Sequence, residues 1–496
     1  MSTQAREVKP VNMAAYGCGD LFAGITGTTL GIWAFYFYTT VVGLSPIEAG
    51  SILAIARFWD AITDPTMGYI TDNTRSRFGR RRVYFLIGIP LTACFGLLWV
   101  DGFGYAYYLV TFLLFNTVFT LVQVPYETLA AEMTSDFKVR SKMTGVRMIF
   151  AQSGALIASW LPAYILQQFE SESTAFVYTG IILGVLCMLP WFFVYKGTWE
   201  RGDLPERNPE PFFREMRKLF AEMRSTFRLK IFRIHLCMYV GAFVALDVFN
   251  ASFVHYLTYV MAYEKTTIGT IVTLLTLMQF LGTPVFAYLC MRNGNSSTYR
   301  VAVSIAACGV LLWTVTAFTA VPAIFALLAA FVLGSSRGGI YLVPWNIYNF
   351  IPDVDEALTR ERREGIFAGV MTLTRKITQA FSIMLVGVVL DFSGFASGAD
   401  VQSDGALTGL KVALLGGTAL FLIFGFVSSY RFGLDKNSHA ALVVEIGRLK
   451  SGGDLASASG DVKRIVEKLT GWSHEKTWGN NDVTHAARAR NKASIN

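Results

Sequence analysis

Two carboxylates, Asp60 and Asp64, lie four residues apart and directly follow an apolar run of the sequence. On a helix, residues at this spacing share one face, so the two side chains are neighbours. Neighbouring carboxylates repel each other unless a cation or a shared proton lies between them, and oxygen ligands suit a hard cation. The spacing therefore predicts a site for a proton or a sodium ion, with metal ligation by the pair only in the sodium case. The alternative is a structural network with Arg57.

Other charged side chains interrupt apolar segments far from this pair. Acids and bases within an apolar span are costly, so each is a candidate for a functional site. Arg147 and Lys376 could bind a negatively charged or hydroxyl-rich substrate, or they could pair structurally with Asp20 and Glu127. Further charged residues of this kind are Asp247, Arg337 and Arg375.

The elements that position these groups follow from composition and hydropathy. Of the 496 residues, 53% are hydrophobic and 16% are charged, whereas about a quarter of a soluble protein is charged. Apolar runs long enough to cross a hydrocarbon core of about 30 Å recur twelve times up to about residue 434. The polar start leads directly into a full-length span, with no pattern of a cleaved signal. The sequence therefore predicts an all-α membrane protein with twelve transmembrane helices.

The net charge of +8 does not indicate a nucleic-acid partner, because the distribution of the basic residues matches a membrane topology. Lys and Arg are concentrated in alternate connections, and such residues stay on the cytoplasmic side. Both termini are therefore predicted to face the cytoplasm. The basic stretches are 75–82, 138–142, 196–233 and 360–363, whereas the intervening connections 43–47, 101–105, 168–175, 318–322 and 392–406 contain no Lys or Arg.

A weak internal repeat relates the two parts of the chain. Pro65 and Pro284 lie 219 residues apart, and the segments "VPYETLAAEM" and "VPWNIYNFIP" match at the same offset. Tyr126 and Trp345, beside the matched prolines of these segments, could stack on the face of a sugar. Two parallel six-helix halves around a central cavity are the major facilitator architecture.

The predicted organisation has four parts. They are an N-terminal six-helix half (1–197), a cytoplasmic central loop (198–229), a C-terminal six-helix half (230–434) and a cytoplasmic tail (435–496). The central loop contains apolar residues at helical spacing among many charges, which predicts an amphipathic helix at the membrane surface. The sequence indicates no function for the tail.

Several stretches resemble a known family of transporters. "ARFWDAITDPTMGYITDNTRSRFGRRR", "YGCGD", "VPYETLAAEM" and "RERREGIFAGVMTLTRK" are similar to motifs of the glycoside–pentoside–hexuronide:cation symporters, the melibiose permease family of the major facilitators. The similarity covers residues 11–435. It implies a monomeric symporter in the bacterial inner membrane that binds a sugar, glycoside or uronide and a coupling cation, H⁺ or Na⁺, and that needs no cofactor. No nucleophile motif or phosphate-binding loop suggests an enzyme.

The resemblance assigns roles residue by residue. The family's paired cation-site aspartates correspond to Asp60 and Asp64, and a threonine that helps bind sodium corresponds to Thr120. The arginine of the fifth span corresponds to Arg147. The lysine at the sugar cavity corresponds to Lys376, with Thr372 one turn earlier.

The chain departs from the family pattern at four matched positions. The aspartate that binds sugar in the first span corresponds to Gly24, with Asp20 one turn away. An aspartate of the fourth span corresponds to Gln123, a tryptophan near it to Glu127, and an asparagine of the sodium site to Thr63. These residues are the remaining candidates for the two sites: Thr63 for the cation, Gln123 for both, and Asp20, Gly24 and Glu127 for the substrate. Because Thr63 and Gln123 leave fewer anionic ligands, protons are favoured over sodium.

The arginines after Asp64 are predicted to have a second role besides topology. In facilitators, a basic loop after the second span binds acids and helix ends on the cytoplasmic face when that face is closed. The candidate gating residues are Asp72, Arg77, Arg81, Glu132 and Asp136. Plain anchoring by positive charge is the alternative.

The charges also indicate the substrate class. With Gly24 and Gln123 uncharged, the basic Arg147, Arg375 and Lys376 give the cavity a small positive excess. This excess favours an acidic sugar, a hexuronide or oligouronide, over a neutral glycoside, because a guanidinium matches a carboxylate. A neutral glycoside and a lysolipid are the alternatives.

Overall fold

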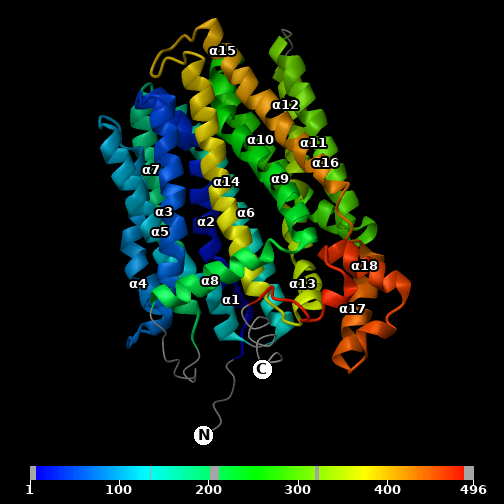
Figure 1. The fold of residues 1–496 in the computed structure, drawn as a ribbon. Helices are drawn as coiled ribbons and strands as arrows, with labels where there is room; N and C mark the ends of the chain where they lie inside the picture. The colour runs from blue at the N-terminus through cyan, green and yellow to red at the C-terminus, as the bar shows by residue number, and fades with distance from the viewer. Residues whose placement is uncertain (1–6, 135, 201–211, 319–322, 485–496) are drawn as a thin grey trace.

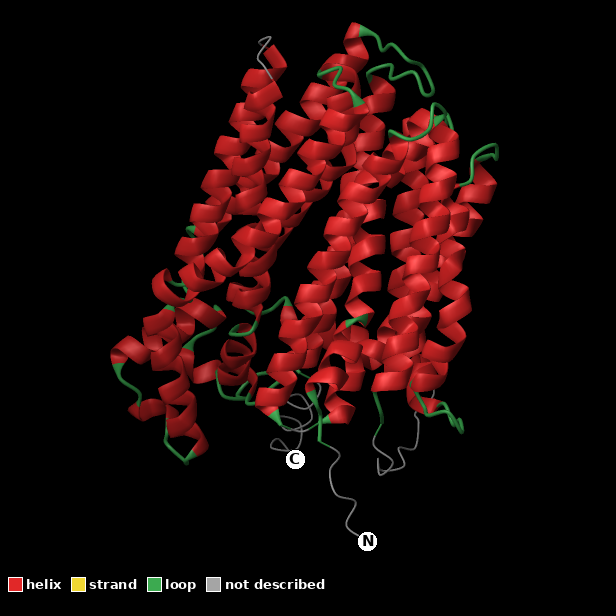
Figure 2. Ribbon diagram, turned by 180° about the vertical axis from the view of Figure 1, so that it is seen from behind, coloured by secondary structure: helices red, strands yellow, loops and turns green. Residues whose placement is uncertain are grey.

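The computed structural model describes residues 7–134, 136–200, 212–318 and 323–484. Within these residues every regular element is a helix (Figure 2). The long helices form one bundle, and the short helices that follow or connect them gather at one end of it (Figure 1). We call this end, which carries α1, α8, α13, α17 and α18, the tail end, and the opposite end the far end.

The first half of the chain crosses the bundle six times. Its elements are α1 (Pro10–Gly17), α2 (Gly19–Thr29) and the π-helices η1 (Leu30–Ala34) and η2 (Phe37–Val41), which together make the first crossing, then α3 (Pro46–Asn73), α4 (Arg82–Leu91) with the 3-10 helix η3 (Thr92–Trp99), α5 (Tyr105–Met133), α6 (Phe137–Leu166) and α7 (Glu172–Gly197).

The second half repeats this pattern. Its elements are α9 (Lys230–His255) with the π-helix η4 (Tyr256–Val260), α10 (Lys265–Asn293), α11 (Asn295–Phe318), α12 (Ala323–Tyr348), α14 (Glu364–Phe392), and a last crossing of α15 (Asp404–Lys411), η5 (Val412–Gly417) and α16 (Thr418–Ser429). Outside the crossings lie α8 (Phe212–Thr226), α13 (Ile351–Thr359), α17 (Lys436–Lys450) and α18 (Gly460–Thr470), with the 3-10 turns η6 (Leu455–Ser457) and η7 (His474–Lys476).

Ten of the twelve crossings are long and apolar enough by themselves to span a membrane. The other two crossings do not meet this criterion of length and hydropathy, each for a reason that can be identified. The first crossing is divided into α and π segments, and α3 carries five charged residues. Those are Glu48, Arg57, Asp60, Asp64 and Asp72. The predicted all-α, twelve-helix architecture is confirmed, and two of the five charges that weaken α3 as a span, Asp60 and Asp64, belong to the predicted cation site.

The residue at which α3 begins determines which side of the helix carries its aspartates. The Ser45 hydroxyl accepts a hydrogen bond from the backbone N–H of Glu48 at 3.3 Å, and the Glu48 carboxylate accepts one from the N–H of Ser45 at 2.9 Å. This reciprocal capping box, together with Pro46 in the first turn, determines where the helix begins. From this start, Asp60 and Asp64 lie one turn apart on one side of the helix.

The internal repeat is visible in the helix boundaries. Pro65 lies inside α3 and Pro284 inside α10, and these helices begin at Pro46 and Lys265, also 219 residues apart. The π-helices η2 and η4 are related by the same offset. The weak proline match in the sequence therefore reflects a repeat of whole helices.

The two halves pack through α3 against α14 and through α6 against α10. Glycine allows both contacts to be close. A Cβ atom on Gly387 would lie 2.5 Å from the Pro46 carbonyl oxygen, and one on Gly269 would lie 2.5 Å from the Ala163 Cβ. Both contacts lie towards the far end, where α3 and α10 begin.

Polar contacts between the halves also gather at the far end. The Thr39 hydroxyl and the His255 ring nitrogen Nε2 are hydrogen bonded at 2.7 Å, and both residues are buried. The backbone N–H of Gly398 donates to the Thr39 carbonyl at 3.1 Å, and Lys265 forms an ion pair with Glu172 at 3.1 Å. The structure is thus closed at the far end.

Candidate functional site

The predicted cation pair lies where three helices meet. The Asp60 carboxylate accepts a hydrogen bond from Arg57 at 3.1 Å, and its side chain is only 4% exposed. Asp64, one turn further along α3, is 32% exposed and accepts a hydrogen bond from the Thr120 hydroxyl of α5 at 2.9 Å. Its second oxygen accepts a hydrogen bond from the Lys376 ammonium group of α14. The two carboxylates therefore each have one basic partner, one local and one from the other half.

Hydroxyl groups extend this cluster. The Thr63 and Thr120 hydroxyls lie 3.3 Å apart, so Thr63 is one contact away from Asp64. One oxygen of Asp60, Oδ1, is buried without a hydrogen-bond partner, which leaves it able to accept a proton or a cation. The structure therefore places four predicted cation-site residues together: Asp60, Asp64, Thr63 and Thr120.

Gln123, the fifth predicted cation ligand, has a different neighbour. Its amide nitrogen donates to the Glu127 carboxylate at 3.5 Å, the upper limit of a hydrogen bond, and its amide oxygen is buried without a partner. Glu127 itself is exposed. Gln123 and Glu127, one turn apart on α5, therefore place polar atoms together, and the buried amide oxygen has no hydrogen-bond donor among the described residues.

Arg147 is held in place by the first crossing. Its Nε and Nη2 atoms donate to the two Asp20 oxygens at 2.7 and 3.0 Å, and its guanidinium carbon lies 4.7 Å from the centre of the Tyr126 ring. A two-point pair of this kind fixes both position and orientation. The side chain remains 21% exposed. Arg147 is thus oriented and accessible, although its charge is already paired with Asp20.

Two predicted substrate residues have packing roles in this structure. Tyr126 is fully buried, and its hydroxyl donates to the Tyr16 carbonyl at 2.8 Å, so its ring supports Arg147 and does not face open space. Gly24 lies against the backbone of α6: a Cβ atom there would be 2.0 Å from the Ala151 carbonyl oxygen. A side chain at Gly24 would push α2 and α6 apart, so in this structure the position serves close packing of these two helices.

The remaining predicted substrate residues are accessible. Thr372 is exposed on α14, one turn before Lys376. Trp345 is 37% exposed and lies edge-on to the Tyr239 ring at 5.8 Å. The ammonium group of Lys376 is bound in this structure to Asp64 of the predicted cation site, and its role at the substrate remains a prediction.

The second half contains a matching ion pair that the sequence did not indicate. Arg375 donates from Nη1 and Nη2 to the two oxygens of Asp247 at 2.5 and 2.8 Å. Each half therefore pairs an aspartate on its first helix with an arginine on its fifth. The symmetry of the halves could have indicated this pair, but the spacing within either helix could not. Because Asp247 neutralises it, Arg375 does not supply the unpaired positive charge that the sequence suggested.

The basic loop after α3 binds acids of its own half. Glu132, at the end of α5, accepts from Arg80 at 2.5 Å and from Arg81 at 3.0 Å, and Arg81 also binds Asp72 at 3.2 Å. Glu200, which the sequence did not indicate, accepts hydrogen bonds from the backbone N–H groups of residues 80–82 at 2.6–2.9 Å. These contacts tie the tail ends of α3, α4, α5 and α7 together.

Two other predicted gating residues stand apart from this cluster. The Arg77 guanidinium lies over the Phe78 ring at 4.7 Å and makes no ion pair with the described residues. Asp136 caps the start of α6 by accepting from the N–H groups of Lys138 and Val139. Their gating roles remain predictions.

The two parallel sets of six helices, with an ion pair between them at mid-helix, define a secondary transporter of the major facilitator architecture. The chain belongs to the MFS/sugar transport protein family, whose model matches residues 15–436. This membership confirms the resemblance noted in the sequence, and it makes the protein a membrane transporter and not an enzyme.

Individual proteins agree with this assignment. The chain is 26% identical to the uncharacterized symporter YnaJ of Bacillus subtilis, over 90% of this chain and 96% of that protein. It is 24% identical to the glucuronide carrier protein homolog of Escherichia coli, over 88% and 95%. Among solved structures, the nucleoside transporter NupG superposes with a TM-score of 0.59 over 86% of this chain and 100% of NupG, at 14% identity, which supports the fold alone.

Proposed function

We propose that the protein is a cation-coupled symporter of the bacterial inner membrane that carries an acidic sugar by alternating access. The observation that carries this proposal is the hydrogen bond from Lys376 to Asp64. It joins the substrate residue expected on α14 to the cation residue expected on α3. The two sites therefore share a charged group.

Shared charge provides a coupling mechanism. Without a coupling ion, the Lys376 ammonium group neutralises Asp64. When a proton or sodium ion binds to the aspartates, Asp64 no longer holds the ammonium group, and Lys376 is free to bind an anion. A unit charge about 4 Å away is worth about 4 kcal/mol at an intermediate dielectric, and coupling between two ligands commonly needs about 1–3 kcal/mol. Cation binding can thus switch on substrate binding.

The same mechanism supports an acidic substrate. Arg147 and Arg375 are each paired with an aspartate. Cation binding would therefore add one unpaired positive charge to the cavity, that of Lys376. Arg147 and Thr372 are accessible to the hydroxyl groups of a sugar. The name of the Escherichia coli relative, a glucuronide carrier homolog, points in the same direction.

Closure at the far end supports the direction of transport. The positive charge of the tail end favours the cytoplasmic side, and the interlocked far end would then face outwards. The structure would represent the inward-facing stage, from which substrate and ion leave into the cytoplasm. The contacts of Thr39 and Lys265 must break for the next cycle.

Uptake into vesicles tests the proposal. We expect labelled glucuronate or galacturonate to accumulate when a proton or sodium gradient is imposed, and Asp64→Asn to abolish accumulation while leaving exchange across the membrane. Asp101→Asn, in a far-end loop, is the control and should transport normally. Uptake that is the same with and without an imposed proton or sodium gradient would contradict symport. Uptake of neutral disaccharides but not of uronates would contradict the acidic substrate.

A further inference from the structure

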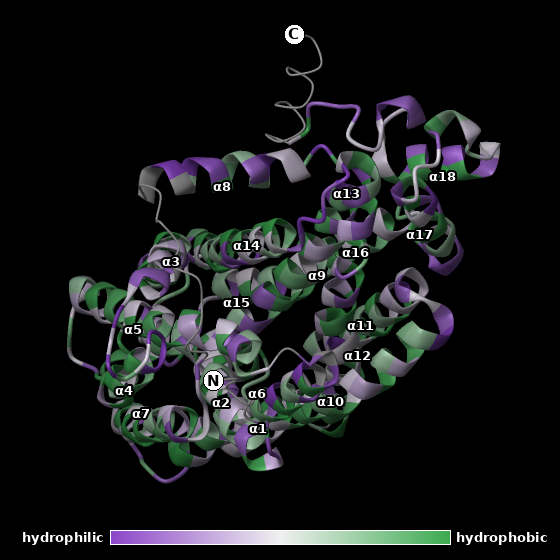
Figure 3. Ribbon diagram, turned by 90° about the horizontal axis from the view of Figure 1, so that it is seen from below, coloured by the Kyte–Doolittle hydropathy of each residue, from purple (hydrophilic) through white to green (hydrophobic). Residues whose placement is uncertain are grey.

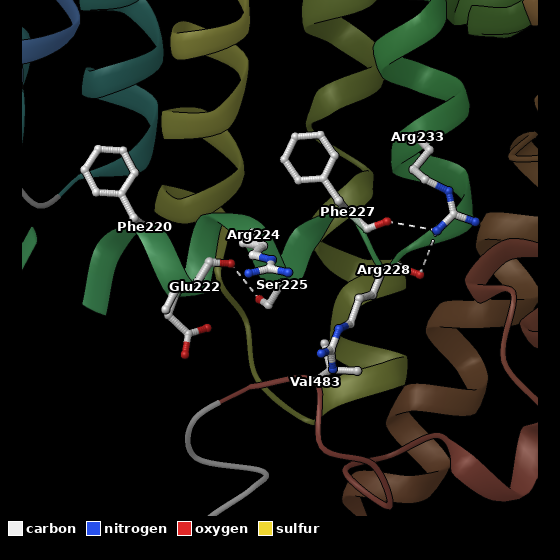
Figure 4. Close-up of a pocket in the computed structure, with 9 residues that line it drawn as sticks. Phe220, Glu222, Arg224, Ser225, Phe227, Arg228, Arg233 and Val483 are labelled. Atoms are coloured by element: carbon white, nitrogen blue, oxygen red, sulfur yellow. Dashed lines mark hydrogen bonds between the residues drawn. The ribbon is translucent and has the colours of Figure 1, made fainter. Parts of the chain in front are cut away.

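A cavity of about 700 Å³ lies at the tail end of the bundle (Figure 4). Its walls come from the end of α8, the connection that follows, the start of α9 and Val483 of the C-terminal segment. Three arginines line it: Arg224, Arg228 and Arg233. Neither the predicted transport site nor the predicted gate uses these residues.

The positive charge of this cavity is only partly compensated. Glu222 is the acidic residue among its lining, and its carboxylate is bound to Arg363 at 2.7 Å. Arg228 has a weak partner in Asp482, at 3.4 Å, and both side chains are exposed. Arg224 is exposed and makes no hydrogen bond or ion pair with the described residues. Among the described residues, the Arg224 guanidinium therefore has no competing partner for an anion, and Arg228 has only a long, exposed ion pair.

Arg233 is oriented by the protein. Its Nη1 atom donates to the carbonyl of Phe227 at 2.9 Å and to that of Arg228 at 3.4 Å (Figure 4). These contacts orient the guanidinium, whose other N–H groups make no hydrogen bond with the described residues. The cavity thus combines one preoriented arginine with two adaptable ones.

Apolar side chains lie on the side of the cavity that faces the bundle. The rings of Phe220 and Phe227 are 53% and 45% exposed. Both point towards the membrane-crossing helices in Figure 4, whereas the Arg228 and Glu222 side chains point the other way. Seen along the bundle, α8 runs across its periphery beside α14 and α3 (Figure 3). This is the position of a helix that lies in the plane of the membrane surface.

We propose that this cavity binds the phosphate head group of an anionic phospholipid. Guanidinium groups match phosphate oxygens in a two-point geometry, and the exposed phenylalanine rings would contact the beginning of the acyl chains. Basic segments at the cytoplasmic surface are attracted to anionic lipids. The lipid would take the place of Asp482 on Arg228 and would hold α8 against the second half.

The site has a structural consequence for the helix that joins the two halves. Glu222 of α8 and Asp355 of α13 both bind Arg363, which directly precedes α14. A lipid held at the end of α8 would thus act on the same helix that anchors the start of α14. Anionic lipid should stabilise the protein as well as bind to it.

Thermal unfolding and native mass spectrometry of the purified full chain test this proposal. We expect phosphatidylglycerol, but not phosphatidylcholine, to raise the melting temperature and to remain bound in the mass spectrum. In R224Q/R228Q the apparent affinity for phosphatidylglycerol should fall about tenfold or more, because two charge-assisted contacts are lost. The matched control is R214Q/R217Q, which removes two exposed arginines of α8 that do not line the cavity.

The alternatives give different results. An equal loss in the control variant, or none in R224Q/R228Q, would overturn the site. Inorganic phosphate that reproduced the whole shift would assign the cavity to a soluble anion and overturn the lipid. If R224Q/R228Q does not fold, the single variant R224Q tests the site, because Arg224 is exposed and makes no hydrogen bond or ion pair with the described residues. It should weaken binding of phosphatidylglycerol severalfold, and unchanged binding would contradict the proposal.

Discussion

Lys376 donates a hydrogen bond to Asp64 across the boundary between the two six-helix halves, from α14 to α3. Since α3 and α14 form one of the two main contacts between the halves, this ion pair joins elements that would move relative to each other in the proposed alternating access. It also occupies the aspartate that a coupling ion would need. The same contact can therefore sense the ion and restrain the movement.

Replacement of the lysine should separate these two functions. In Lys376→Gln, Asp64 loses its internal cation, so we expect tighter binding of the coupling ion, by about tenfold or more. Binding of uronates should be lost or become independent of the ion. Titration calorimetry with glucuronate, at two pH values and with and without sodium, measures both effects. Unchanged affinity for the ion in Lys376→Gln would contradict the mechanism, and Lys411→Gln near the far end is the control.

How far the site could be predicted depends on which kind of contact is considered. The neighbourhood of Asp60 and Asp64 follows from helical periodicity. Contacts between helices do not, because adjacent residues on a helix point about 100° apart. Arg375 and Lys376 are neighbours in sequence, yet one binds Asp247 of its own half and the other Asp64 of the opposite half.

The fold was more predictable than the site for a related reason. Ten of the twelve crossings follow from the length and hydropathy of each segment alone, which are local properties. The burial of Tyr126 under Arg147 and the close approach of Gly24 to Ala151 depend on how α2, α5 and α6 are rotated against each other. Such rotations are set by packing over the whole bundle, and a motif match cannot supply them.

The pair formed by Arg147 and Asp20 should be strongly coupled energetically. Removal of one partner leaves a charge that is mostly buried, which costs about 3 kcal/mol. We expect Arg147→Gln and Asp20→Asn each to lower the free energy of unfolding by up to this amount. The double variant should lose much less than the sum of the two, because no unpaired charge remains. Denaturation of the purified variants in detergent measures this cycle, and additive losses would show that the two residues act independently.

The basic loop allows gating to be separated from anchoring. Glu132 is 7% exposed and has two arginine partners, so Glu132→Gln should lower the melting temperature measurably. Arg77 is exposed and makes no ion pair with the described residues, so Arg77→Ala should leave the melting temperature unchanged. If Arg77 instead binds acids when the tail end closes, Arg77→Ala should slow transport severalfold without changing substrate choice. Normal transport in both Arg77→Ala and Arg77→Lys would favour plain anchoring.

Close packing at the far end should be necessary for the conformation that the structure shows. Because a Cβ atom on Gly269 would lie 2.5 Å from that of Ala163, Gly269→Leu must push α10 away from α6 near the end where Thr39 binds His255. We expect this variant to favour the state that is open at the far end and to transport slowly. Spin labels at Phe103 and Val401, two exposed far-end positions in opposite halves, should move apart in a cysteine-free background. Gly145→Leu on α6 is the control, since an added Cβ there meets nothing within 4 Å. An unchanged distance in Gly269→Leu, or an equal change in the control, would show that this contact does not hold the far end closed.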